Sequence, residues 1–344
     1  MARGRRRTGM RRTIALLGLP LLMAVGCAPA DSAPARPSSG SPDQRREAFD
    51  QRAAEVAARW RPGPAWTTGY VPLQEGTVLT GDPGFTPDTE TAFRAGWYRD
   101  QIPLPAAKPG DGSIQFPDGT LRVPLVSAAE AYAQLDQGDP PPCDGRPKEP
   151  GSTGGPGRPK DGGPTIEPGP DGPVSSPVQT ACIPLTVIAV KLGTASVRTS
   201  RGVAEVPAWL FTVDELKTPV ARVAVAPSAV AAVPPGDGPT GPVPDGVVGA
   251  ESLDAADGTR LDYRLAVGAC DTAITPRVLE RDDVVVVGGS VTRSTGVCTL
   301  QLVLKPVTVT LKAPLGTRPV LNVSSGAPLT CTAARLTGSA VPRC

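Results

Sequence analysis

Two stretches rich in proline and glycine limit where this chain can build a folded core. Residues 138–177 hold 22 prolines and glycines out of 40, and residues 234–246 hold nine out of 13. Such segments have too few large apolar side chains to offset the entropy lost when a backbone is ordered. We therefore expect an α+β domain over 41–233 with a disordered insertion at 138–177, a linker at 234–246 and an all-β domain over 247–344.

The first 26 residues have the pattern of an export signal. Six arginines and no acidic residue accompany an apolar run at 14–25. This run is shorter than the roughly 20 residues that span a bilayer, but it suits the core of a signal peptide. Ala24-Val25-Gly26 then leads into Cys27, which resembles the lipobox of bacterial lipoprotein precursors.

Cleavage before Cys27 would free this cysteine to carry a diacylglycerol. Two acyl chains can hold a protein on a membrane, whereas one is marginal. Residues 27–40 would then be a disordered tether, because they are mostly alanine, proline and serine. The predicted location is the outer face of the cytoplasmic membrane. The alternative is an ordinary secretory signal that leaves Cys27 as a spare thiol.

Charge and composition exclude several classes of function. After the signal, 29 basic and 33 acidic residues remain, which gives no electrostatic footprint for nucleic acid. The chain has no histidine, so mechanisms that use imidazole as a base or as a metal ligand are excluded. It also lacks a G-x-S-x-G elbow and an S-x-x-K pair. We therefore predict a non-catalytic protein without a cofactor or a metal.

Six cysteines follow Cys27, and an even number in an exported chain indicates disulfides. Six cysteines allow 15 connectivities, and we predict that neighbours in sequence pair. The predicted pairs are Cys143–Cys182, Cys270–Cys298 and Cys331–Cys344.

Local signals predict a few short helices. Ser41-Pro42-Asp43-Gln44 is a capping box with proline at the first helical position, and Phe49, Ala53, Val56 and Trp60 recur on one face of the helix that follows. Residues 89–95 predict one or two helical turns. A second capping box, at 127–130, opens a helix that ends near residue 138.

Runs of β-branched and apolar residues predict most of the remaining structure. Pro117-Asp118-Gly119 indicates the turn of a β-hairpin, and Pro207 suggests that its strand is an edge or carries a bulge. The predicted fold is mainly β with a few short helices, with a β-sandwich-like C-terminal domain and a smaller α+β N-terminal region. The predicted strands are 77–80, 114–116, 120–125, 185–192, 195–199, 203–213, 220–225, 261–267, 284–287, 299–304, 307–311 and 318–323.

Nine of the 13 aromatic residues lie between Phe49 and Phe116. A group of exposed aromatic rings could bind sugars or a peptide, and Trp66, Tyr70, Trp97 and Tyr98 are the candidates for such a surface. The favoured alternative is that these rings form the core of a small domain.

Two short patterns resemble elements of uncharacterised secreted lipoproteins of actinobacteria. One is Thr199-Ser200-Arg201-Gly202 followed by Val206-Pro207-Ala208-Trp209-Leu210-Phe211, and the other is Pro314-Leu315-Gly316 followed by Arg318, Val320 and Leu321. The excess of arginine over lysine, 28 to seven, agrees with a GC-rich genome. The resemblance implies the compartment but no known activity, cofactor or partner. We interpret Arg318 as a structural anchor.

Three functional hypotheses follow. The favoured one is a membrane-anchored envelope lipoprotein that binds another protein or a wall polymer without catalysis. The second is a lipoprotein that binds a small molecule. The third is a histidine-free hydrolase of envelope glycans that uses carboxylates among Asp262, Glu280, Asp282 and Asp283, although these residues equally suit solvated turns.

Overall fold

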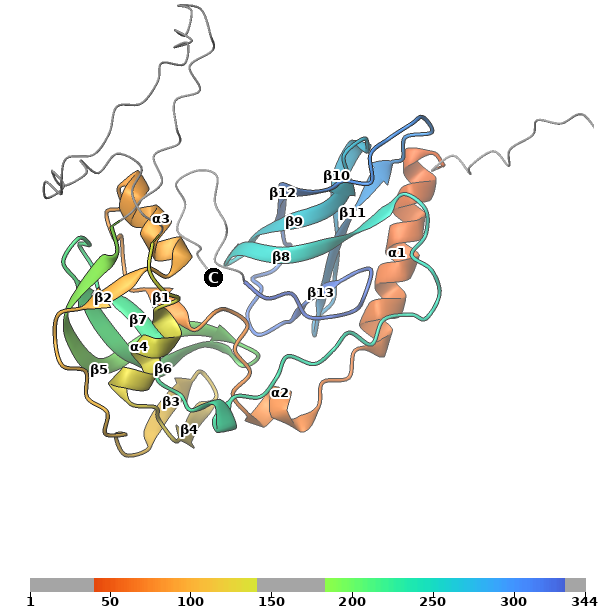
Figure 1. Cartoon of the computed structure of the whole chain (residues 1–344). Coiled ribbons are helices and arrows are strands. Elements are labelled where there is room, and N and C mark those ends of the chain that lie inside the picture. Colours follow the sequence, from red (N-terminus) through yellow and green to blue (C-terminus); the bar gives the residue numbers. More distant parts are fainter. Residues whose placement is uncertain (1–39, 141–182, 332–344) are drawn as a thin grey trace, which may run out of the picture. The chain divides into compact units, whose positions relative to one another are not determined.

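The computed structural model describes residues 40–140 and 183–331. Over these ranges the chain is mainly β, with two curled sheets and four α-helices (Figure 1), which confirms the predicted fold class. No helix in the described ranges has both the length and the apolar character needed to cross a membrane. The predicted signal peptide, the tether, most of the insertion and residues 332–344 lie outside the described residues.

The first helix, α1 (Pro42–Arg59), begins as its sequence predicts. The Ser41 side chain accepts a hydrogen bond from the backbone of Gln44, and the Gln44 side chain reciprocates. The predicted apolar face is buried, with Phe49, Ala53 and Val56 almost fully enclosed. A reciprocal cap and an apolar stripe at helical spacing are local signals, so this helix could be read from its own residues.

The other helices are short. They are α2 (Pro64–Thr68), α3 (Pro87–Ala95) and α4 (Ala128–Leu135). Thr86 and Ser127 cap α3 and α4 through reciprocal capping boxes, as predicted for the second of these. Gly96 ends α3 in the left-handed conformation, which glycine adopts without a steric penalty.

The first sheet has seven strands in the order β1-β7-β6-β3-β4, with β5 paired to β6 and β2 paired to β5. All pairs are antiparallel except β2 with β5. The strands are β1 (Thr77–Leu79), β2 (Tyr98–Asp100), β3 (Gly112–Phe116), β4 (Gly119–Val123), β5 (Leu185–Thr199), β6 (Gly202–Val213) and β7 (Val220–Val223). The predicted hairpin around Asp118 is present as β3 and β4.

Two expectations for this sheet were wrong. The predicted strands 185–192 and 195–199 form one strand, because β5 continues through Gly193 in register with β6. Pro207 lies in the central strand β6 rather than at an edge. It is tolerated because one side of β6 changes neighbour from β3 to β7 there, and its carbonyl accepts a hydrogen bond from the Ala224 amide at 2.8 Å.

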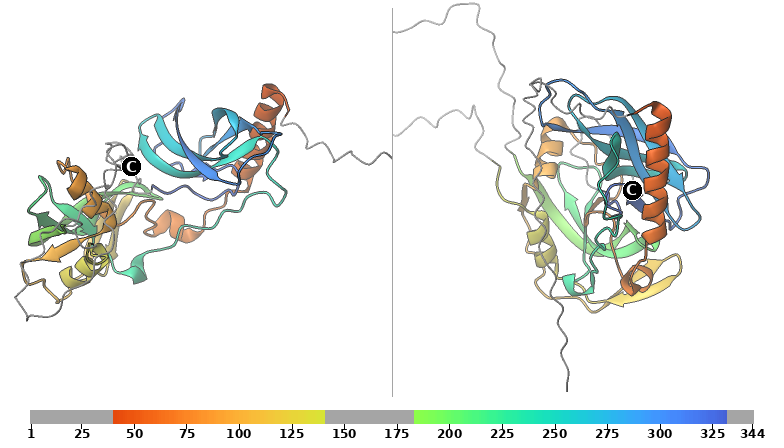
Figure 2. Two further views of the ribbon diagram at one scale, coloured as in Figure 1. Left: turned by 45° about the horizontal axis from the view of Figure 1, so that its top comes forward. Right: turned by 90° about the vertical axis from the view of Figure 1, so that its right-hand side faces the viewer.

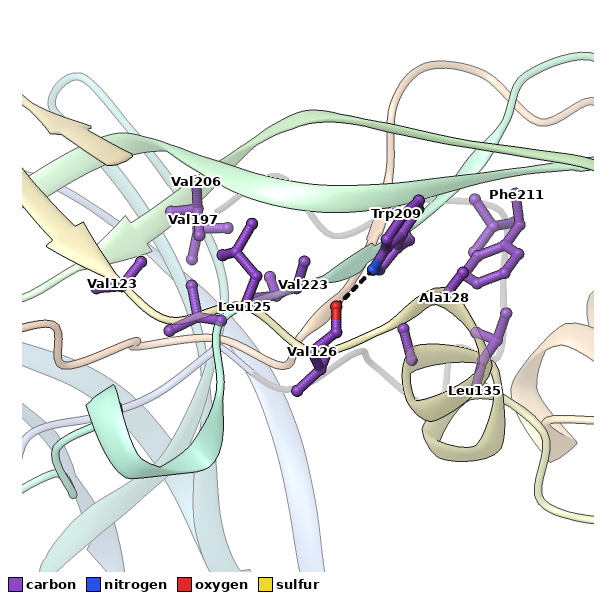
Figure 3. Packing of buried hydrophobic residues seen from close by; sticks show 14 of the residues in the cluster. Val123, Leu125, Val126, Ala128, Leu135, Val197, Val206, Trp209, Phe211 and Val223 are labelled. Carbon is purple, nitrogen blue, oxygen red and sulfur yellow. Dashed lines mark hydrogen bonds between the residues drawn. The ribbon is translucent and has the colours of Figure 1, made fainter. Parts of the chain in front are cut away.

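The core of the first sheet packs against α4. Figure 3 shows Trp209 of β6 facing Val126, in the chain that leads into this helix, and Phe211 facing the helix itself. The Trp209 indole N–H donates to the Val126 carbonyl at 3.0 Å, so the buried ring keeps a partner for its only polar atom (Figure 3). Ala128 and Leu135 complete this contact from the helix.

The second sheet has six strands in the order β10-β11-β8-β9-β12, with β13 parallel to β11. The strands are β8 (Val247–Asp257), β9 (Arg260–Gly268), β10 (Thr272–Glu280), β11 (Val285–Thr292), β12 (Leu302–Thr310) and β13 (Val320–Asn322). Strands β8 and β10 were missed, because their mixed composition lacks a clear alternation. The predicted strands 299–304 and 307–311 form the single strand β12, which runs through Pro306.

The predicted N-terminal domain, 41–233, does not match the packing of α1, which lies within that range. The buried face of α1 joins Val284, Val286 and Val323 in one apolar cluster, and Figure 2 shows the helix along the strands of the second sheet. Phe49 and Val56 thus cover the C-terminal sheet rather than an N-terminal one. Sequence spacing shows which face of a helix is apolar but not which distant strands it meets.

The segment predicted as a linker, 234–246, is held by hydrogen bonds. The buried guanidinium of Arg52 donates to the carbonyls of Pro239 and Gly241 at 3.0 and 3.2 Å. The same guanidinium also donates to Val323 and Ser324, at 3.4 and 3.0 Å. One side chain therefore donates hydrogen bonds to four backbone carbonyls that lie outside the helices and strands.

Candidate interaction surface

The predicted aromatic surface is absent, because most of its members are buried. Trp66, Tyr70 and Tyr98 are almost fully enclosed, and Trp97 is half-buried. Tyr70 and Tyr98 lie in the core of the first sheet, where burial raises the pKa of each phenol. Trp66 lies in a different cluster, with its ring edge-to-face against Trp60 at 5.2 Å. The alternative interpretation, that these rings are core, is the one the structure bears out.

The cysteine predictions are confirmed at one pair. Cys270 and Cys298 form a disulfide. Cys331 is also a disulfide cysteine, but the predicted Cys143–Cys182 and Cys331–Cys344 pairs involve residues outside the described ranges. Cys27 lies outside them too.

The carboxylates suggested for glycan hydrolysis do not gather into one site. Glu280 accepts from the Lys312 amide at 2.9 and 3.1 Å and pairs with Arg318 at 3.6 Å. Asp262 instead pairs with Arg260, and Asp282 and Asp283 are exposed. Among the described residues, no group of three or more acidic or cysteine side chains could hold a metal ion.

Arg318 is the structural anchor that its sequence context predicts. Its guanidinium donates to the carbonyls of Ala313 and Pro314, both at 2.9 Å, and to Arg281 at 3.0 Å. These bonds close the turn that leads into β13. Every nitrogen of the guanidinium contacts a backbone oxygen or Glu280. Arg318 is therefore committed to the fold.

The most unusual surface feature lies at the start of β12 and in the loop before it. The side chains of Val297 and Leu300 are fully exposed, Leu302 is 64% exposed and Leu304 is 40% exposed. We call these four residues the β12 surface. Single exposed aliphatic residues are common, but four within one short stretch mark a site of interaction or a liability for aggregation.

The loop that carries Val297 and Leu300 is tied to the turn after β9 at two points. The disulfide joins Cys298 to Cys270, at the end of the turn after β9. Next to it, the Ala269 amide donates to the Gln301 carbonyl at 3.0 Å. The β12 surface is therefore held on a fixed scaffold rather than on a free loop.

An ion pair supports the same base. Arg293 pairs with Asp271 at 2.7 Å, and the Asp271 carboxylate also accepts from the Gly268 amide at 2.8 Å. The Asp271 side chain is almost fully buried, so its charge is neutralised locally. This acid therefore contributes little negative potential beside the β12 surface.

The outer side of β9 and β12 divides into a charged half and an apolar half. In the register of the pair, Leu302 and Leu304 lie opposite Gly268 and Ala266. Thr308 lies further along, opposite Asp262, where acids and arginines are paired. The strand pair therefore presents aliphatic groups at the end that bears the disulfide.

The acids at the charged half are neutralised by neighbouring groups. Asp254 accepts from Arg264 at 2.8 Å. Partial burial raises the pKa of Asp262, but the hydrogen bonds from Arg260 and Thr308 outweigh it and leave that pKa below its usual value. Lys305 follows Leu304, but strand alternation places it on the side of β12 that bears Val303 and Val307.

The sequence does contain a pattern that marks this surface, although it is not the alternation of apolar and polar residues by which strands are usually predicted. Leu302, Val303 and Leu304 are consecutive aliphatic residues, so a strand through them places apolar side chains on both of its faces. Only Val303 packs against the core of the second sheet. Because both faces could be buried in a sandwich, the sequence alone could not show that one face is open.

Comparison with protein-family models, curated proteins and solved structures finds no match to this chain.

Proposed function

We propose that this chain is a lipid-anchored, extracytoplasmic envelope protein that acts by binding rather than by catalysis. The lipobox-like residues before Cys27 support the anchor. The Cys270–Cys298 disulfide supports an oxidising compartment outside the cytoplasm. The partner is an envelope component, and nucleic acid is not among the expected partners because the chain after the signal is mildly acidic.

The observation that carries the proposal is the β12 surface. Covering solvent-exposed aliphatic side chains with a partner is favourable. The free energy gained is about 25 cal/mol for each Å² of apolar surface removed from water. The disulfide and the Asp271–Arg293 pair hold these side chains in place before binding. A surface ordered in advance loses less entropy on association.

Crosslinking in cells tests the proposed binding surface. A photoreactive residue at Leu300 in the anchored chain should capture a defined envelope component. The same residue at Val243, an exposed valine in the 234–246 segment, is the matched control. Capture at Leu300 that disappears in a Val297→Ser variant and is absent at Val243 supports the proposal. Equal capture at both positions contradicts it.

The lipid anchor has its own test. Replacing Cys27 with alanine should move the chain from the membrane fraction to the soluble fraction after a high-salt wash. The control is Cys27→Ala combined with Leu300→Ser, which also weakens any contact through the β12 surface. Retention of the double variant on the membrane would contradict lipidation at Cys27.

A further inference from the structure

Arg198, near the end of β5, has a guanidinium group that the fold leaves without a partner. The residue is only 7% exposed, and its Nε atom is enclosed without a hydrogen bond. Its two terminal nitrogens also have no partner among the described residues, but they are not fully enclosed. A guanidinium does not lose its proton in a protein, so a positive charge is buried here without compensation.

The other two buried arginines in the described ranges are treated differently by the fold. Arg52 donates to four backbone carbonyls, and Arg45 donates to the carbonyl of Gly40. Burial lowers the pKa of the Arg198 guanidinium, and no nearby charge opposes this effect. The cost of burying Arg198 is therefore not offset by the fold itself.

The acid on the neighbouring strand is used elsewhere. In the ladder of β5 and β6, Arg198 lies opposite Val203 and Ser196 lies opposite Glu205. Val197 points into the core, so alternation places Arg198 and Ser196 on the other face of the strand. Glu205 is thus a diagonal neighbour of Arg198 on that face. Its carboxylate accepts a hydrogen bond from the Ser196 hydroxyl and forms no ion pair with Arg198.

Gln74 provides a second donor beside Arg198. Its side-chain oxygen accepts from the Arg198 backbone amide at 2.8 Å, which fixes how the side-chain amide is oriented. The NH₂ group of Gln74 then remains as a donor without a partner among the described residues. A guanidinium and an amide NH₂ group that are both unused, with no acid paired to either, form a site that suits an anion.

This site lies close to the segment that joins the two sheets. The Leu73 amide donates to the Arg198 carbonyl at 2.9 Å, and the Leu73 carbonyl accepts from the Cys331 amide at 2.7 Å. Cys331 also forms a β-bridge with Leu253 of β8. Ligand sites are common where two folded layers meet, because neither layer fills the space at the junction alone.

We propose that Arg198 and Gln74 bind the carboxylate group of a small ligand. The planar fork of a guanidinium matches the two oxygens of a carboxylate, and the Gln74 amide donates to one of them. A carboxylate has one negative charge, which neutralises the one positive charge buried here, whereas a doubly charged anion would leave an excess. The site is separate from the β12 surface, so it does not depend on the proposed function.

Thermal unfolding with acetate as the probe tests this site. The Cys27→Ser chain, which cannot be lipidated, is unfolded at pH 7 in acetate or in chloride of equal ionic strength. About 20 mM of each salt limits general salt effects. Acetamide is the neutral analogue of acetate. At about ten times its dissociation constant, acetate should raise the thermal midpoint by about 3–5 °C, and acetamide should leave it unchanged.

Two buried arginines give a matched pair of variants. Arg198→Met removes the unpaired charge and keeps an unbranched side chain, so it should lose the acetate response without a lower midpoint in chloride. Arg52→Met removes the hydrogen bonds to four carbonyls, so its midpoint in chloride should fall while the acetate response remains. A purely structural role for Arg198 predicts that its variant behaves as the Arg52 variant does.

Gln74→Glu tests the site without removing Arg198. Glutamate still offers an oxygen to the Arg198 backbone amide, but it replaces the NH₂ donor with a negative charge. This change should weaken acetate binding at least about tenfold. It also serves as the second test if Arg198→Met does not fold, which circular dichroism shows.

An acetate shift that Arg198→Met and Gln74→Glu abolish and Arg52→Met retains supports the inference. No shift in the unchanged chain overturns it, and so does an equal shift in the Arg198 or the Gln74 variant. Crosslinking at Leu300 is independent of these measurements. Failure of the carboxylate site therefore leaves the proposed function standing, and failure at Leu300 leaves the carboxylate site standing.

Discussion

The guanidinium of Arg52, on α1, donates to the carbonyl of Ser324 at 3.0 Å although 272 positions separate them in sequence. The same side chain reaches Pro239 at 3.0 Å. Replacement by alanine would leave several carbonyls without a partner, so we expect the free energy of unfolding to fall by about 3 kcal/mol. Urea denaturation checks this value.

Arg46 provides the control for this prediction. It lies on the exposed side of α1 and pairs with Asp43 at 3.8 Å. Arg46→Ala should change stability by less than about 0.5 kcal/mol. Equal losses for Arg52→Ala and Arg46→Ala would show that the four-carbonyl contact does not stabilise the fold.

Trp209 offers a test of a single buried hydrogen bond. Trp209→Phe removes the indole N–H that donates to Val126 and leaves that carbonyl unpaired in the core. We expect a loss of about 1–3 kcal/mol. The larger change Trp209→Ala should cost about 3–5 kcal/mol, since it also leaves a cavity. If Trp209→Phe unfolds at the same urea concentration as the unchanged chain, the hydrogen bond has no net effect.

The disulfide between Cys270 and Cys298 closes a loop with a sequence separation of 28. In the chain-entropy model, removing such a crosslink costs about 3–4 kcal/mol. The double variant Cys270→Ser, Cys298→Ser should lose this amount in urea denaturation. A second expected result is faster proteolysis at the loop of Val297 and Leu300, which the disulfide ties to the turn after β9. Unchanged proteolysis would mean that the other contacts at the base suffice.

Acid should weaken the charged half of the second sheet. The pKa of Asp262 lies below its usual value in the folded chain, so its contribution to stability is present above the unfolded pKa of about 3.9 and is lost as the pH falls through the folded pKa. Asp262→Asn should flatten the fall of the thermal midpoint below about pH 4.

Asp282→Asn is the control for this pH dependence. Asp282 is exposed and has no hydrogen-bonded partner among the described residues. This variant should keep the acid dependence of the unchanged chain. A curve for Asp262→Asn that coincides with the control would show that other groups cause the acid sensitivity.

Features that depend on a few adjacent residues could be predicted from the sequence. The caps at Ser41 and Ser127 and the turn around Asp118 are where their residues indicate, because each is fixed by local hydrogen bonds or by the φ preferences of proline and glycine. The Cys270–Cys298 pair was also predicted, as the two cysteines are neighbours among the six.

Features that depend on distant partners could not be predicted in this way. The sequence shows that α1 has an apolar face, but not that Val286 and Val323 cover it. It marks Pro207 as unsuited to a regular ladder, but not that β6 changes neighbours at this residue. Aromatic residues close in sequence were candidates for a surface, yet Tyr98 and Trp66 lie in separate apolar clusters.

The β12 surface was missed for the same reason. Consecutive aliphatic residues such as Leu302 and Leu304 are apolar whether a partner strand covers them or water does. Only the three-dimensional arrangement shows that this side of β12 is open.

Each sheet also contains one long hairpin with a two-residue turn, β5–β6 at Ser200-Arg201 and β8–β9 at Gly258-Thr259. Short turns have a small loop-closure cost, so these pairs can form early, before strands that are remote in sequence join them. The two sheets therefore have separate local starting points for folding. Neither hairpin needs the other to be in place before it forms.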